Sequence, residues 1–175
     1  MVLFLAWCDV PRDWLASLEI TSGRDGCRGA GLCRICREER FVRGEGVSPY
    51  YVNDTFVTVP DGALTQKLTG IAKNVAATAG SSVHEGKVWS TDAILRETKI
   101  VVNKVIDQGA IAVDMVSSPF LTIAQVYKIP AVSILAVSDN LITGEMGFMN
   151  PSYYMAESML IQMAMELVKQ LESGK

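Results

Sequence analysis

Apolar residues recur at intervals of three and four in two long segments, and each segment is predicted to be an amphipathic helix. The first opens at Asp61, closes at Gly80 and has its apolar positions on one face, at Leu64, Leu68, Ile71, Val75 and Ala79. The second covers residues 152–171, where the stripe consists of Met155, Met159, Met163, Leu167 and Leu171. A methionine stripe of this kind is typical of a face packed into a core.

Short apolar runs between the helical segments predict strands. Residues 82–89, 110–115 and 132–137 are such runs, and the last two are apolar almost throughout, as in strands buried on both faces. Residues 1–8 are expected to form a further core strand, and residues 51–59 to be extended. Two more helices are predicted, one over residues 92–108 and one over residues 119–128.

The alternation of strands and helices indicates an α/β protein with a mostly parallel or mixed central sheet flanked by helices. Sheets of this class bind ligands at the carboxyl ends of their strands. Polar residues follow two of the predicted strands: Asp114 precedes Met115 at the first, and residues 138–140 read Ser-Asp-Asn at the second. We therefore expect a binding site where these two strands end.

The composition and charge of the chain do not indicate a nucleic-acid or membrane partner. The 175-residue chain is 49% hydrophobic and carries a formal net charge of −3, which is ordinary for a globular protein and gives no reason to expect nucleic acid or a membrane. The apolar run at residues 1–8 is too short to span a bilayer and lacks the basic start of a signal peptide. A cytoplasmic location is the default expectation.

Arginine and cysteine are concentrated near the start of the chain. Seven of the eight arginines and all four cysteines lie in the first 43 residues. Cys33 and Cys36 form one C-x-x-C pair, but a structural zinc site usually needs two such pairs, so reduced thiols are the favoured interpretation and no metal is predicted. Another explanation of residues 24–41 stays open: the segment arises from a frameshift in the gene or from a decayed gene copy. A GC-rich gene that is translated in a wrong frame yields a protein rich in Arg, Gly and Cys.

Four blocks, at residues 43–51, 86–94, 109–118 and 133–140, resemble in their order the purine-nucleoside/uridine phosphorylase family. The resemblance runs from residue 43 to about residue 170. It implies one phosphorylase-like domain over residues 1–175, with residues 1–42 as a divergent Arg/Cys-rich segment and an incomplete N-terminal part. It also implies a pentosyltransferase that cleaves the N-glycosidic bond of a purine or pyrimidine nucleoside, with inorganic phosphate as co-substrate, no other cofactor, and a homo-oligomeric state.

The resemblance assigns roles to four residues at the strand ends. Asp139 matches the carboxyl group that protonates the departing base in the purine branch. Met115 matches the position beneath the sugar and base, and Ile94 an apolar position that contacts the base. Asp114 is grouped with these two as nucleoside-binding. Turn capping by Asp139 and core packing by Met115 and Ile94 are the alternatives.

The chain departs from the family pattern at two sites. Val116 stands where the family has a glutamate that accepts hydrogen bonds from ribose hydroxyls, a contact worth about 1.5–3 kcal/mol. Leu18 falls where the phosphate-binding arginine is expected, which leaves Thr21 and Ser22 as phosphate donors without a visible positive charge. These departures predict impaired activity, and the alternative is an inactive relic of the fold that binds a nucleoside or base, or serves as an interaction module.

Overall fold

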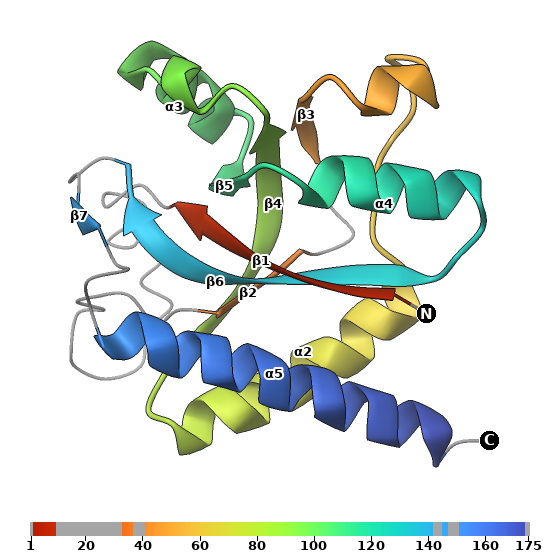
Figure 1. Ribbon diagram of the computed structural model, residues 1–175, viewed down its shortest axis with the longest axis vertical. Coiled ribbons are helices and arrows are strands. Elements are labelled where there is room, and N and C mark those ends of the chain that lie inside the picture. Colours follow the sequence, from red (N-terminus) through yellow and green to blue (C-terminus); the bar gives the residue numbers. More distant parts are fainter. Residues whose placement is uncertain (1, 10–32, 37–40, 142–144, 147–150, 174–175) are drawn as a thin grey trace.

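The computed structural model describes residues 2–9, 33–36, 41–141, 145–146 and 151–173 (Figure 1). Among these residues seven strands form one sheet: β1 (Val2–Asp9), β2 (Cys33–Cys36), β3 (Val42–Gly44), β4 (Val83–Thr91), β5 (Ala110–Asp114), β6 (Ala131–Asn140) and β7 (Glu145–Met146). The helices are α2 (Gly62–Thr78), α3 (Lys99–Asp107), α4 (Ser117–Val126) and α5 (Pro151–Glu172), with short 3₁₀ turns η1 (Ser48–Tyr50) and η2 (Ile94–Arg96).

The sheet is mixed and closes on itself. Its strands follow the order β1-β5-β4-β2-β6-β7, β3 pairs with β4, and β1 also pairs with β6. The strands β2, β3, β4 and β5 run in one direction, and β1 and β6 run in the other. Because β1 joins β5 on one side and β6 on the other, the sheet is curved rather than open.

The carboxyl ends of three strands meet at one residue. The backbone of Asp9, the last residue of β1, is in register with Val113 of β5 and with Asp139 of β6. Paired residues on neighbouring strands lie about 4.5–5.5 Å apart between Cα atoms. The ends of β5 and β6, separated by more than twenty positions in the sequence, therefore come within about two strand spacings of each other.

One face of the sheet is covered by α2 and α5, which lie side by side below β6 in Figure 1. Asp61 begins α2 by accepting a hydrogen bond from the backbone N–H of Leu64 at 2.9 Å. The buried apolar side chains of this face include Leu68, Ile71, Val132, Ile134, Met163 and Leu167. Of the predicted stripe of α5, Met159, Met163 and Leu167 are buried in the core and Leu171 packs against it, whereas Met155 is 46% exposed.

The other face is covered by α4, whereas α3 packs, near the end of β5, against strand residues that alternate with those touching α4 and so point the opposite way. Leu121 and Ala124 of α4 pack with Val88, Ala112, Leu135 and Val137 of the sheet. Val102 and Val105 of α3 pack with Trp89 and Val113. Among the described residues, no helix is both long enough and apolar enough to cross a membrane.

The structure confirms the α/β class and most of the expected elements. Two expectations are wrong. Residues 51–59 are irregular rather than extended, because a turn at Asn53 interrupts them: Phe56 N–H donates to the Asn53 carbonyl and Thr55 Oγ1 donates to Asn53 Oδ1. The expected helix over residues 92–108 is divided into η2 and α3, because Glu97 and Thr98 leave helical geometry (ψ 54° and 154°) and Ile94, 57% exposed, is not held by the core.

Candidate functional site

A buried carboxylate lies at the end of β5. Asp114 is 5% exposed, and Ser90, its neighbour in the register of β4, donates a hydrogen bond to Asp114 Oδ1 at 2.5 Å. The backbone N–H of Ser117 donates to Asp114 Oδ2 at 2.8 Å. Burial raises the pKa of Asp114, although the hydrogen bonds from Ser117 and Ser90 act to lower it.

A second buried carboxylate, Glu45, is joined to the first through serines. The N–H of Ser118 donates to Ser90 Oγ at 2.9 Å, and Ser118 Oγ donates to Glu45 Oε1 at 3.3 Å. Glu45 Oε2 accepts from the N–H groups of Val47 at 2.8 Å and Ser48 at 2.9 Å. The network therefore ties the segment between β3 and η1 to the start of α4.

Further hydroxyl groups extend this network toward β6 and the loop after η1. Ser117 Oγ and Ser133 Oγ lie 2.9 Å apart, which links α4 to β6. Ser48 Oγ donates to Thr122 Oγ1 at 3.1 Å, and Thr58 Oγ1 lies 2.6 Å from the same atom. All five side chains are buried, and their hydroxyl groups form hydrogen bonds within the protein.

The residues that follow Asp114 turn outward. Met115 is 48% exposed and Val116 is 45% exposed, and both precede the first residue of α4. Ile94, in η2 directly after β4, is also exposed. Because β4 and β5 are parallel neighbours, Ile94 and Met115 lie at the same end of the sheet.

Asp139 occupies the end of β6, next to the start of α5. It is half-buried, and Ser138 Oγ donates a hydrogen bond to Asp139 Oδ2 at 2.7 Å. Tyr153 of α5 is buried, and its hydroxyl donates to Glu157 Oε1 at 2.8 Å. Burial, the bond to Glu157 and nearby charges, including that of Asp139, hold the pKa of Tyr153 above its usual range.

A family model described as the Phosphorylase superfamily matches residues 35–160 of the chain. The chain belongs to the phosphorylase superfamily. The match begins inside β2, within the Arg/Cys-rich segment, and contains the strand ends that carry Asp114 and Asp139.

Curated relatives support the same assignment over a shorter region. Purine nucleoside phosphorylases of the DeoD type from Bacillus cereus and Bacillus thuringiensis are each 39% identical over 66 residues, which is 38% of this phosphorylase-superfamily chain and 28% of the relative. The matched region is thus less than a third of the length of those enzymes.

Solved structures show the fold over nearly the whole chain. Purine nucleoside phosphorylase from Toxoplasma gondii, solved with immucillin-H, matches 100% of the chain and 65% of its own length, with a TM-score of 0.75 and 13% identity. AMP nucleosidase from Bacteroides thetaiotaomicron matches 98% of the chain and 62% of its own length, with a TM-score of 0.67 and 21% identity. At these identities the likeness shows the fold alone.

Some expected site residues lie outside the described part of this superfamily member. These are Thr21 and Ser22, expected to donate to phosphate. Within the described ranges, no group of three or more His, Cys, Asp or Glu side chains is arranged to hold a metal ion. Ser90, Ser117 and Glu45 were not predicted, although each stands in one of the blocks that carry the family resemblance, at residues 86–94, 109–118 and 43–51 respectively.

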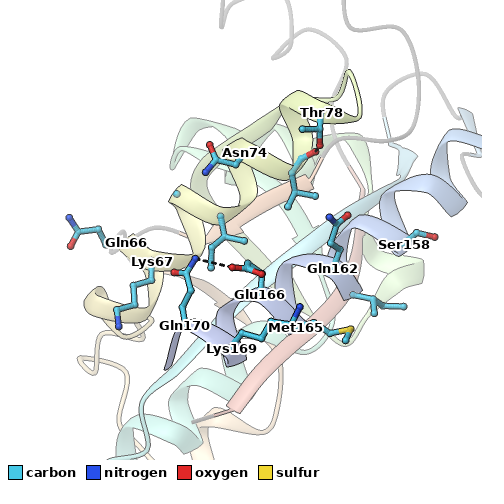
Figure 2. Close-up of a pocket in the computed structure, with 14 residues that line it drawn as sticks. Gln66, Lys67, Asn74, Thr78, Ser158, Gln162, Met165, Glu166, Lys169 and Gln170 are labelled. Carbon is cyan, nitrogen blue, oxygen red and sulfur yellow. Dashed lines mark hydrogen bonds between the residues drawn. The ribbon is translucent and has the colours of Figure 1, made fainter. Parts of the chain in front are cut away.

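A groove between α2 and α5 lies away from the strand ends (Figure 2). Its volume is about 870 Å³, and its lining is largely amide and apolar, including Asn74, Gln162, Met165 and Gln170. Figure 2 shows Gln170 hydrogen-bonded to Glu166 within the groove, at 3.3 Å. The groove contains neither Met115 nor Asp139, so it is a separate feature of the surface.

Proposed function

We propose that this protein binds a purine nucleoside where β5 and β6 end, and that it cleaves the N-glycosidic bond by phosphorolysis with reduced efficiency. The observation that carries the proposal is the pairing of Asp9 with both Val113 and Asp139, because it brings the two strand ends to one place. Membership of the phosphorylase superfamily supplies the class of reaction.

The proposed reaction exchanges one bond at the anomeric carbon. A phosphate oxygen attacks C1′ of the nucleoside, the bond from C1′ to the base nitrogen breaks, and its electron pair moves onto the base. The carboxyl group of Asp139 donates a proton to the base as it leaves, which yields free base and ribose 1-phosphate. The half-buried position of Asp139 at a strand end suits this role, because the carboxyl group is reachable and partly shielded from water.

Met115 and Ile94 are proposed to contact the sugar and base. Both are exposed, both lie at the same end of the sheet, and neither is needed to fill the core. Thr21 and Ser22 are proposed as phosphate donors. Inorganic phosphate is then the only co-substrate and the protein a homo-oligomer, as the family resemblance implies, and a cytoplasmic location, the default expectation from the sequence, completes the proposal.

A purine is preferred over a pyrimidine as the base because the curated relatives are named purine nucleoside phosphorylases. In addition, Thr98 and Ile100 stand where the uridine branch has the glutamine and arginine that read uracil. Neither the hydroxyl of Thr98 nor the apolar side chain of Ile100 reproduces the donor and acceptor set of those two side chains.

The test is a phosphate-dependent assay of base release from inosine, adenosine, uridine and methylthioadenosine. We expect release from the purine nucleosides only when phosphate is present. Asp139→Asn should lower the rate by about 100-fold or more, because it removes the proton donor. Asp107→Asn is the matched control, since Asp107 is exposed and its replacement makes the same change of charge. The absence of phosphate-dependent release from all four nucleosides would contradict the proposed activity.

A second function, binding without turnover, is favoured by Val116. This exposed side chain accepts no hydrogen bond at the position where the family resemblance places the ribose-binding glutamate. Calorimetric titration with inosine and hypoxanthine separates the two functions. Saturable binding without base release would identify a non-catalytic binder, and the absence of binding by either ligand would contradict both functions.

A further inference from the structure

Asp114 and its two successors face opposite directions at the end of β5. Asp114 is 5% exposed, whereas Met115 and Val116 are 48% and 45% exposed. Both carboxylate oxygens are engaged within the protein, Oδ1 by Ser90 and Oδ2 by the N–H of Ser117. A ligand at the strand ends can therefore reach Met115 and Val116 without reaching the carboxylate that precedes them.

The hydrogen bonds of Asp114 determine how α4 begins. Val116 stands at the N-cap position of α4 and offers no side-chain acceptor. Asp114 supplies the missing acceptor from two residues upstream, by receiving the N–H of Ser117. Ser90 Oγ receives the next N–H, that of Ser118, and donates its own hydrogen to Asp114. The first amides of α4 are thereby closed by protein groups, which leaves no open anion site there.

Because of these bonds, the backbone of residues 115 and 116 is held at both ends. Before it, Asp114 is paired with Ser90 through the parallel register of β4 and β5. After it, the first two residues of α4, Ser117 and Ser118, are anchored to Asp114 and Ser90. The hydrogen bonds of Asp114 and Ser90 therefore fix the direction in which the Met115 side chain projects.

We propose that Asp114 is a positioning residue, which acts with Ser90 to hold the turn that presents Met115 to the nucleoside and does not itself touch the ligand. This inference rests on the proposed function. It replaces the nucleoside-binding role expected for Asp114 from the sequence. A direct role would require the carboxylate to leave two charge-assisted hydrogen bonds and a buried position.

Two ligands distinguish positioning from contact. Inosine carries the 2′ and 3′ hydroxyls that a carboxylate would accept, and 2′,3′-dideoxyinosine lacks both. The dissociation constants of both ligands are measured for the wild type, Asp114→Asn and Ser90→Ala, with Asp107→Asn as the control for charge. Asp114→Asn preserves the shape of the side chain and exchanges one acceptor oxygen for a donor group.

A positioning role predicts that Asp114→Asn weakens both ligands by the same factor, about tenfold. Ser90→Ala should have a similar effect, and the double variant should lose little more than the stronger single variant, because the two residues act as one unit. A loss confined to inosine would assign a direct contact and overturn the inference. Unchanged affinity for both ligands in both variants would also overturn it.

Amide exchange provides a readout that needs no ligand. Exchange at the N–H of Ser117 should become at least about tenfold faster in Asp114→Ala, which removes both acceptor oxygens and with them the hydrogen bond from that amide, and stay unchanged in Asp107→Asn. Unchanged exchange would refute the positioning role directly. If the wild type bound neither nucleoside, the proposed function would be refuted, and the proposed role of Asp114 would be refuted together with it. If the wild type bound a nucleoside and Asp114→Asn left that affinity unchanged, only the positioning role would be refuted.

Discussion

The helix pair α2 and α5 and the start of α4 are held against the sheet by different kinds of interaction. Between the sheet and the helix pair α2 and α5, the buried side chains are apolar, with Leu68, Met163 and Leu167 among them. Between the sheet and the start of α4, two buried carboxylates and a set of serine and threonine hydroxyls are joined by hydrogen bonds. Apolar burial supplies free energy without demanding one direction, whereas hydrogen bonds specify direction. The candidate site adjoins the second of these regions, where direction matters.

The largest effect is expected on the apolar face. Met163 is fully buried, so Met163→Ala should lower the free energy of unfolding by about 2–5 kcal/mol, the usual cost of a deleted core side chain. Urea denaturation measures this change. At temperatures where the variant is folded, its nucleoside affinity should equal that of the wild type. A change in affinity as large as the change in stability would mean that the two regions are not separate.

Val116→Glu tests the region beside the start of α4, and it should change the affinity for inosine. Val116 is 45% exposed, so a glutamate is accommodated there, and it restores an acceptor for the ribose hydroxyls. We expect inosine to bind about 10- to 100-fold more tightly, with little change in stability. Val126→Glu is the control: Val126, 39% exposed, lies at the far end of α4, and its replacement should leave the affinity unchanged. Equal affinities in both variants would show that Val116 does not face the ribose.

Replacement of two glycines by alanine should change the stability in opposite directions, because one glycine is closely packed and the other is not. A Cβ atom at Gly86 of β4 would lie 2.6 Å from Ile111 Cδ1 and 2.9 Å from Ile111 Cγ1, so Gly86→Ala should destabilise the fold by about 1–3 kcal/mol. At Gly70 of α2 nothing lies within 4 Å, so Gly70→Ala should stabilise by about 0.5–1 kcal/mol. Thermal unfolding of both variants measures the pair. Shifts of the same sign would contradict the packing of β4 against β5.

The smallest effect is a dependence of stability on pH. The folded state raises the pKa of Asp114 above its ordinary value, so the folded state holds this proton to higher pH than the unfolded state does. The contribution of Asp114 to stability is therefore greatest below the ordinary pKa near about 3.9 and is lost as the pH rises through the folded pKa. Relative to Asp114→Asn, the stability of the wild type should fall as the pH increases across this range. Urea midpoints measured from pH 4 to pH 7 test the slope, and an opposite slope would contradict it.

The apolar elements of the fold were predicted from the sequence, whereas contacts between distant segments were not. The helices α2 and α5 and the strands β5 and β6 were predicted because their apolar positions are periodic or continuous. Residues 92–108 misled the prediction, because Ile94 and Leu95 were taken as part of an apolar helical pattern although both are exposed in the structure. The pairing of β1 with both β5 and β6 was not predicted, because strand order and direction depend on contacts between distant segments.

The candidate site was predicted only in part. The strand-end pattern and the family resemblance pointed to Met115 and Asp139, and the paired strand ends place their backbones at one region of the sheet. The network of Ser90, Ser117 and Glu45 was not predicted, since isolated polar residues give no periodic signal and their role depends on partners from other elements. The inward direction of Asp114 likewise follows from the hydrogen bonds and not from its position in the sequence.

The central claim is that the nucleoside binds where β5 and β6 end and not in the groove between α2 and α5. Methyl-labelled methionine reports on both places in one titration, because Met115 is exposed beside the end of β5, Met165 lines the groove and Met163 lies in the core. Addition of inosine should shift the methyl signal of Met115 in a saturable manner and leave those of Met165 and Met163 in place. A saturable shift of Met165 with an unmoved Met115 would contradict the claim.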